Sequence, residues 1–208
     1  MKTMKKLASA ALALVMALCL TVPAFATAPQ TGSITVTNAV PGQTYTIYKL
    51  FDLAYGGAGV ENESDQPEAE GSHDPHTYSI LSNSDWFGFV NPEGGDAATG
   101  KGYVTLTAST ENVGEGITKY YVAWNTGDAA EFAKAALAYA KANNIASAKP
   151  AETAPAAAEG ATTSTVTFSE LELGYYLIDS SLGALCALDT TNFNANIREK
   201  NEKPTDKK

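Results

Sequence analysis

The sequence predicts a mainly β protein, a β-sandwich that carries one inserted α-helix. Short runs of alternating β-branched, aromatic and polar residues recur along the chain, and turn-forming Gly, Pro and Asn separate them. Strand-like and helix-like segments do not alternate, as they would in an α/β fold. Many short strands with a single helical pattern are typical of a sandwich.

Composition and net charge indicate a globular protein and exclude some classes of partner. The chain has 208 residues, of which 44% are hydrophobic and 18% charged, so we expect one or at most two globular domains. The net charge is −9 and becomes −12 once the three lysines of residues 1–26 are removed. So acidic a chain lacks the basic surface that binds nucleic acid, and anionic lipid would repel it. We therefore expect neither nucleic-acid nor membrane partners for the processed protein.

Residues 1–26 have the three parts of a signal peptide. Lysines at positions 2, 5 and 6 precede the apolar run Leu7 to Leu20, and Ala24-Phe25-Ala26 follows as a cleavage site. The run is shorter than the roughly 20 apolar residues of a membrane span. We expect cleavage between Ala26 and Thr27 and a secreted or cell-surface protein. Cys19 leaves with the signal, so Cys186 has no disulfide partner and is expected to fill apolar space.

The processed chain begins with two strand patterns. Gly32 to Leu53 alternates and is broken once, at Val40-Pro41-Gly42-Gln43, which predicts a hairpin. In its second arm the alternation places Tyr45, Ile47, Phe51 and Leu53 on one face, with Tyr48 and Leu50 opposite. This arm is therefore expected to be buried on both faces.

The remaining segments complete a domain over residues 27–200. Further strands are expected at Thr77 to Leu81, Gly102 to Thr107, Lys119 to Trp124, Ser164 to Phe168, Tyr175 to Asp179, Ala184 to Asp189 and Ala195 to Glu199. A helix is expected from Asp128 to Asn144, with Phe132 and Tyr139 towards the sheet. Gly56 to Pro75 and Ser147 to Ala161 are predicted loops, and residues 201–208 a polar linker or truncated boundary.

No motif predicts catalysis, a metal site or a cofactor site. His73 and His76 lie in the acidic loop without further rigid ligands, and the loop's carboxylates lack the spacing of a calcium site. The chain lacks a nucleophile elbow, and Gly56-Gly57-Ala58-Gly59 precedes no helix. We expect a protein that is not an enzyme and has no cofactor. The pairs Trp86-Phe87 and Tyr120-Tyr121 fit either a core or a glycan-binding surface.

Four motifs resemble a known family. They are Gly32–Thr37 (GSITVT), Tyr45–Asp52 (YTIYKLFD), Phe168–Ile178 (FSELELGYYLI) and Ile197–Asn201 (IREKN). In this order, behind a signal peptide, they look like the N-terminal domain of isopeptide-forming fimbrial proteins, the sortase-assembled pilins of Gram-positive bacteria. The resemblance implies an Ig-like β-sandwich of the collagen-adhesin B type. It also implies a non-catalytic structural or adhesive role in a pilus.

Family domains can carry a Lys–Asn isopeptide bond assisted by a carboxyl group. In this chain the position of the lysine is Asn38, placed by alternation on the Ile34 and Val36 face, and that of the acid is Ser180. The closing asparagine remains, as Asn201. The usual bond is therefore not expected, and Lys49, predicted on the Ile47 and Phe51 face, is the substitute donor to consider.

Resemblance to the family implies assembly through a longer form. The printed sequence contains neither a Leu-Pro-x-Thr-Gly signal nor a Tyr-Pro-Lys motif, and Lys200, Lys203, Lys207 and Lys208 are acceptor candidates by position only. We expect the leading domain of a longer pilin, with other pilus subunits and sortase as partners, or a secreted relative. The alternatives are a secreted carbohydrate-binding or host-ligand adhesin domain, recognising a host glycan or matrix ligand, and, with least support, a glycosidase-like enzyme.

Overall fold

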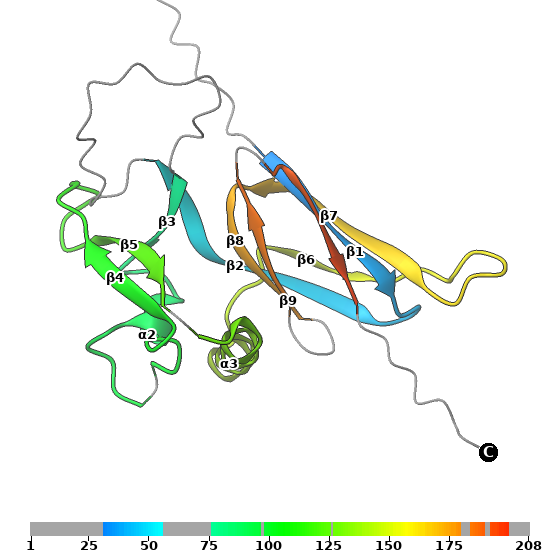
Figure 1. Ribbon diagram of the computed structural model, residues 1–208, viewed down its shortest axis with the longest axis horizontal. Coiled ribbons are helices and arrows are strands. Elements are labelled where there is room, and N and C mark those ends of the chain that lie inside the picture. Colours follow the sequence, from blue (N-terminus) through cyan, green and yellow to red (C-terminus); the bar gives the residue numbers. More distant parts are fainter. Residues whose placement is uncertain are drawn as a thin grey trace, which may run out of the picture. The chain divides into compact units, whose positions relative to one another are not determined.

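The computed structural model describes residues 31–55, 76–96, 98–125, 127–179, 184–189 and 192–199. Over these residues the protein is mainly β (Figure 1). The elements are β1 Thr31–Ala39, β2 Thr44–Tyr55, β3 His76–Leu81, α2 Phe87–Val90, β4 Val104–Ala108, β5 Lys119–Trp124, α3 Ala129–Asn143, β6 Lys149–Thr153, β7 Ser164–Glu172, β8 Gly174–Asp179, β9 Ala184–Leu188 and β10 Asn194–Arg198.

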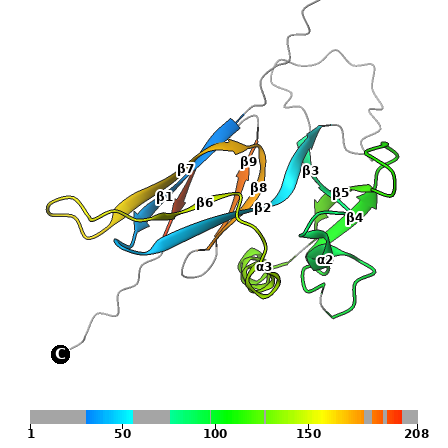
Figure 2. The same cartoon turned by 180° about the vertical axis from the view of Figure 1, so that it is seen from behind.

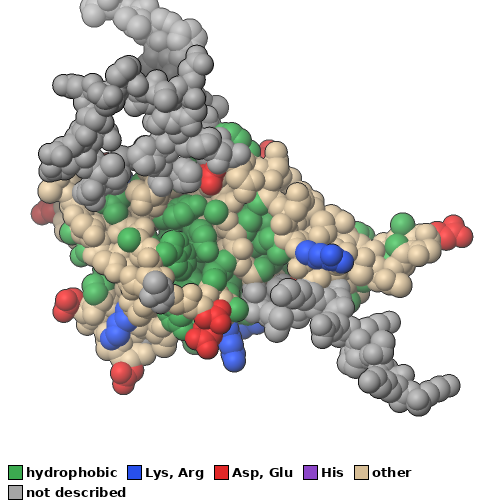
Figure 3. All heavy atoms as spheres, viewed as in Figure 1, with side chains coloured by type: hydrophobic (Ala, Val, Ile, Leu, Met, Phe, Trp, Pro, Cys, Tyr) green, Lys and Arg blue, Asp and Glu red, His purple; other side chains and the backbone are tan. Residues whose placement is uncertain are grey.

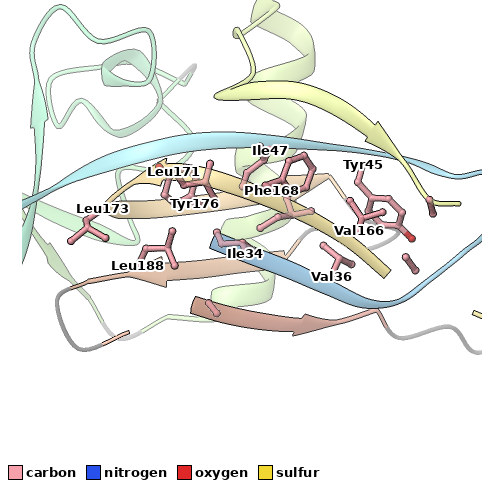
Figure 4. Close-up of a cluster of buried hydrophobic side chains, with 14 residues drawn as sticks. Ile34, Val36, Tyr45, Ile47, Val166, Phe168, Leu171, Leu173, Tyr176 and Leu188 are labelled. Carbon is pink, nitrogen blue, oxygen red and sulfur yellow. The ribbon is translucent and has the colours of Figure 1, made fainter. Parts of the chain in front are cut away.

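The strands form two sheets. The smaller has the order β10-β1-β7, and the larger has the order β4-β5-β3-β2-β8-β9, with β6 also paired to β2. Side chains of both sheets meet in one buried cluster, which we call the inter-sheet core (Figure 4). Its larger members are Ile34, Val36, Tyr45, Ile47, Val166, Phe168, Leu171, Tyr176, Ile178 and Leu188. Two sheets with a shared core are compatible with a β-sandwich.

Strand β2 is buried on both faces, as its sequence predicts. Tyr45 and Ile47 belong to the inter-sheet core, whereas Tyr48 and Leu50 belong to a second core. The prediction for Phe51 is wrong, because Phe51 lies in the second core rather than beside Ile47. A register shift between Lys49 and Phe51 in the pairing with β8 interrupts the alternation. Lys49 therefore shares a face with Ile47 but not with Phe51.

The predicted hairpin between β1 and β2 is also wrong. The turn exists, with Gln43 N–H donating to the Val40 carbonyl at 3.0 Å and Gly42 in the left-handed region at φ 81°. The two strands, however, lie in different sheets, and both contribute to the inter-sheet core. Each strand therefore obtains its hydrogen bonds from distant segments, and the turn carries the chain from one sheet to the other.

Residues 147–161, predicted to be a loop, contain β6. This strand pairs with the N-terminal part of β2, matching Thr44 with Thr153 and Tyr45 with Glu152 (Figure 2). Backbone bonds between Ala154 and the turn at Gly42 and Gln43 extend the contact. Since the side chains of β6 are mostly exposed, the strand has no apolar pattern by which the sequence could predict it.

Helix α3 packs over the second core. Asp128 caps its first turn by accepting the Ala130 N–H at 2.8 Å, and Asn144 ends it in the left-handed conformation. Phe132, Ala136 and Ala140 are buried against aromatic side chains of the larger sheet and of α2. Phe132 lies 4.9 Å from Trp124 and 5.3 Å from Phe89, measured between ring centroids. Tyr139 is half-buried and contacts Trp86 and Phe89.

Several predictions concern residues outside the described ranges. They are the signal peptide 1–26 with its Ala26–Thr27 cleavage site, the acidic loop with His73, the Ser180 and Asn201 positions, and the tail 201–208. Within the described ranges, no helix is both long enough and apolar enough to span a membrane.

The buried Phe132 ring generates a stability prediction. Phe132→Ala should lower the free energy of unfolding by about 3 kcal/mol, because it removes a fully buried aromatic ring and leaves a cavity. Urea unfolding followed by circular dichroism measures this change. Lys134→Ala, an exposed position of the same helix, should stay within about 0.5 kcal/mol. Equal effects of the two substitutions would contradict the packing of α3.

Candidate functional site

The Lys49 side chain, the substitute donor for a cross-link, joins two carboxylates. Its Nζ lies 2.6 Å from Asp52 Oδ1 and 2.8 Å from Glu172 Oε2, and the side chain is 20% exposed. Because Glu172 belongs to β7 and Lys49 to β2, this ion pair connects the two sheets. Gly174 leaves room for the lysine stem, since a Cβ there would lie 2.8 Å from Lys49 Cε and 2.5 Å from the Phe51 carbonyl oxygen.

The electrostatics of this cluster keep Lys49 charged. Burial is the largest single influence on the pKa of Lys49 and lowers it, but the hydrogen bonds and charges of Asp52 and Glu172 together outweigh burial and raise the pKa above its usual value. The hydrogen bond from Lys49 lowers the pKa of Glu172. An ammonium group has no lone pair with which to attack a carboxamide. The arrangement therefore makes Lys49 an ion-pair partner rather than a nucleophile.

Asn38, at the family's lysine position, interrupts the alternation of β1. Its backbone is left-handed at φ 59°, and the pairing of β1 with β7 shifts register between Thr37 and Ala39. As a result Ala39, not Asn38, is the next fully buried residue after Val36. The prediction that Asn38 simply continues the inward face is therefore wrong, because a bulge intervenes.

A buried acid that was not among the predicted site residues lies beside this end of β1. Glu199 is 3% exposed, and its N–H donates to the Thr37 carbonyl at 2.9 Å. Burial raises the pKa of the nearby Tyr45 hydroxyl, and the charge of Glu199 raises it further. The burial of Glu199 could have been predicted from the sequence, because alternation from Ala195 and Ile197 places Glu199 on the inward face of β10. The structure thus brings Asn38 and Glu199 to one end of the β1–β10 pair and places Lys49 elsewhere.

Trp86, Phe87 and Tyr120 belong to the second core. Trp86 is buried against Tyr48 and Phe89, and the Phe87 and Tyr120 rings stack at 5.2 Å. The structure therefore favours a role in the core over glycan binding for Trp86, Phe87 and Tyr120. Among the described residues, Trp124 is instead the exposed large hydrophobic side chain, at 40%. In the sequence, Trp124 only marks the end of a predicted strand.

The remaining candidates are the potential metal ligands and the Cys186 thiol. In the described part of the chain, no three His, Cys, Asp or Glu side chains are grouped to hold a metal ion. Cys186 is half-buried against the inter-sheet core, and burial raises the pKa of its thiol to about 11. A thiol with so high a pKa is a poor nucleophile at neutral pH.

Comparison of the whole chain with protein-family models and with curated proteins finds no match.

The geometry around Lys49 predicts a protein without an intramolecular isopeptide bond. Forming that bond would expel one ammonia and lower the mass by about 17 Da. Intact-mass spectrometry should therefore give the calculated mass of the processed chain, because Lys49 is held as an ammonium by Asp52 and Glu172.

A deficit of about 17 Da would contradict this prediction. The donor could then be identified with two variants. Lys49→Ala would restore the calculated mass if Lys49 were the donor, whereas Lys141→Ala, which removes an exposed lysine paired with Asp179, serves as the matched control.

Proposed function

We propose that this protein is an extracellular, non-catalytic structural domain of a Gram-positive pilus subunit, an Ig-like sandwich of the collagen-adhesin B type into which α3 is inserted. The support from sequence is the signal peptide pattern and the four motifs that resemble sortase-assembled fimbrial proteins. The support from structure is a strand arrangement suited to carrying tension. Partners of such a domain are other pilus subunits and the sortase that joins them.

The observation that carries the proposal is the pairing of the first and last described strands. β1 and β10 run parallel, with Ser33 opposite Asn194 and Thr37 opposite Arg198. Because the strands are parallel, the start of β1 and the end of β10 lie at opposite ends of the pair (Figure 1). Tension along the chain loads the hydrogen bonds of such a pair together in shear, whereas a hairpin would open one bond at a time.

The surroundings of β1 reinforce this arrangement. β1 is the central strand of its sheet, so extracting it breaks ladders to both β10 and β7. Ile34 and Val36 are fully buried, and their removal would expose part of the inter-sheet core. The ion pair of Lys49 with Glu172 adds a non-covalent connection between the sheets. A domain with this arrangement resists extension without a covalent cross-link.

A second role, that of a host-ligand or carbohydrate-binding adhesin, is favoured by one observation. Trp124 is 40% exposed and contacts the Tyr175 ring, and aromatic side chains are enriched in binding interfaces relative to the rest of a protein surface.

The proposed role in a pilus can be tested in the native host. Antibodies raised against the domain should label surface fibres, and the same antibodies should detect covalent polymers that survive boiling in detergent. Labelling of a monomer in the culture medium alone would favour a secreted relative over a pilus subunit.

Single-molecule extension tests the shear geometry. Pulling from the two chain ends should require a severalfold higher force than pulling between the C-terminal end and a cysteine introduced by Pro41→Cys. Position 41 lies in the exposed turn after β1, at the same end of the pair as Arg198, so the second geometry opens β1–β10 bond by bond.

The introduced thiol can be labelled selectively, because burial keeps the pKa of Cys186 at about 11. Equal rupture forces in the two geometries would show that the β1–β10 pair carries no load.

A further inference from the structure

We propose that the hollow beside Trp124 is a binding site for an alkylammonium cation, a ligand carrying a quaternary or methylated ammonium group. This inference goes beyond the load-bearing role and does not depend on it. The hollow lies where the end of β5, the beginning of α3 and the beginning of β8 meet. Hydrophobic side chains gather at the surface between β5 and β8 (Figure 3).

Four aromatic side chains line the hollow. Phe132 lies at the buried end, with Trp124 at 4.9 Å and an interplanar angle of 81°, and Tyr103 at 5.5 Å and 69°. Tyr175 lies 5.0 Å from Trp124 at 54°. All four rings line one hollow of about 240 Å³. Rings set steeply to one another present several π faces to a single small group, which is the geometry that recognises quaternary ammonium ions.

The rings are held in place before any ligand arrives. Phe132 is fully buried in the second core, and Trp124 and Tyr175 both contact Phe51 of β2 as well as each other. A rigid aromatic surface loses little conformational entropy on binding. Gly127 permits the close approach of the chain to Tyr103, since a Cβ there would lie 3.1 Å from the Tyr103 ring.

The charges at the hollow complement a cation. Asp128 lines it, and the Tyr103 hydroxyl donates to Glu131, in the first turn of α3, at 3.5 Å. No lysine or arginine is among its lining residues within the described chain. The N-terminus of α3 contributes a partial positive charge of about half a unit, which two carboxylates outweigh. The whole chain is acidic, with a net charge of −9, so the long-range field also attracts cations.

Size and charge together favour this ligand over the alternatives. The volume is below the range of roughly 300–1,000 Å³ that is typical of drug-sized ligands, so one small group fits better than an extended molecule. A sugar would use one flat ring and adjacent hydrogen-bonding groups. Here the Asn125 side chain already accepts from Thr105 and donates to the Gly102 carbonyl, and Asp128 Oδ1 is engaged by the helix cap.

The test uses tetramethylammonium chloride as the probe and NMR titration of the purified protein as the measurement. The indole N–H resonance of Trp124 should shift with a millimolar dissociation constant, while that of the buried Trp86 should not. Sodium chloride at equal concentration controls for ionic strength. The neutral isostere neopentane is poorly soluble, so 3,3-dimethylbutanol serves as the uncharged analogue and choline as its charged counterpart.

Two variants measure separately the contributions of the Trp124 ring and of the Asp128 charge to binding. Trp124→Ala lacks the indole, so its titration is followed by the backbone amide of Gly127, and the substitution should weaken binding by about tenfold or more through loss of the best cation–π partner. Asp128→Asn should weaken it about two- to fivefold, because it removes a partly exposed charge while asparagine still caps the helix. Glu159→Gln, the same loss of charge in the exposed loop between β6 and β7, should leave binding unchanged.

Each outcome decides the proposal. Equal binding of choline and 3,3-dimethylbutanol would overturn it in favour of a plain apolar site, and binding of methyl glucoside but not choline would overturn it in favour of a sugar site. No shift of Trp124 with any probe would also overturn it. If the cation binds, comparing choline with N-ε-trimethyllysine identifies whether the natural source is a choline group or a methylated lysine, whereas tighter binding of n-butylammonium than of either would overturn the choice of a methylated ammonium group.

Discussion

Burial of β2 on both faces is the constraint on which the rest of this structure depends. One face of the strand contributes Tyr45 and Ile47 to the inter-sheet core, and the other contributes Tyr48, Leu50 and Phe51 to the second core. A strand in this position needs a covering layer on each side. The smaller sheet covers one face and the α3 and α2 region covers the other, so removing either layer would expose an apolar side of the same strand.

The irregularity between Lys49 and Phe51 allows β2 to meet both demands. Strict alternation would place Phe51 on the same face as Ile47 and Lys49. The register shift moves Phe51 into the second core, while Lys49 Nζ reaches Asp52 and Glu172 at the edge of the first. A buried lysine is costly without partners, so the two carboxylates are what make this position compatible with a core.

The two proposed functions, cation binding at the aromatic hollow and resistance to tension at the β1–β10 pair, lie in different regions of the molecule. The strands that would carry tension belong to the smaller sheet, whereas Phe132 belongs to the second core on the other side of β2 and Trp124 contacts it from the exposed side. A ligand bound at Trp124 would therefore contact residues outside the β1–β10 ladder. Separation of this kind lets loops and helices on one side of a scaffold vary without weakening the pairing on the other.

The sequence by itself determined the local elements: the alternating strands, the helix that begins near Asp128 and ends at Asn144, and a second strand apolar on both sides. Such local elements depend on residues that are close together in the sequence, so the pattern of one sequence is enough to predict them. Only the tertiary structure decided that β1 pairs with β10 rather than β2, that β6 is a strand, and that Glu199 is buried. Backbone hydrogen-bonding groups are nearly the same in every residue, so they do not reveal which strands pair, and the bulges at Asn38 and between Lys49 and Phe51 change which side chains face inward. The hollow at Trp124 likewise exists because β5, α3 and β8, distant in sequence, place their aromatic residues together.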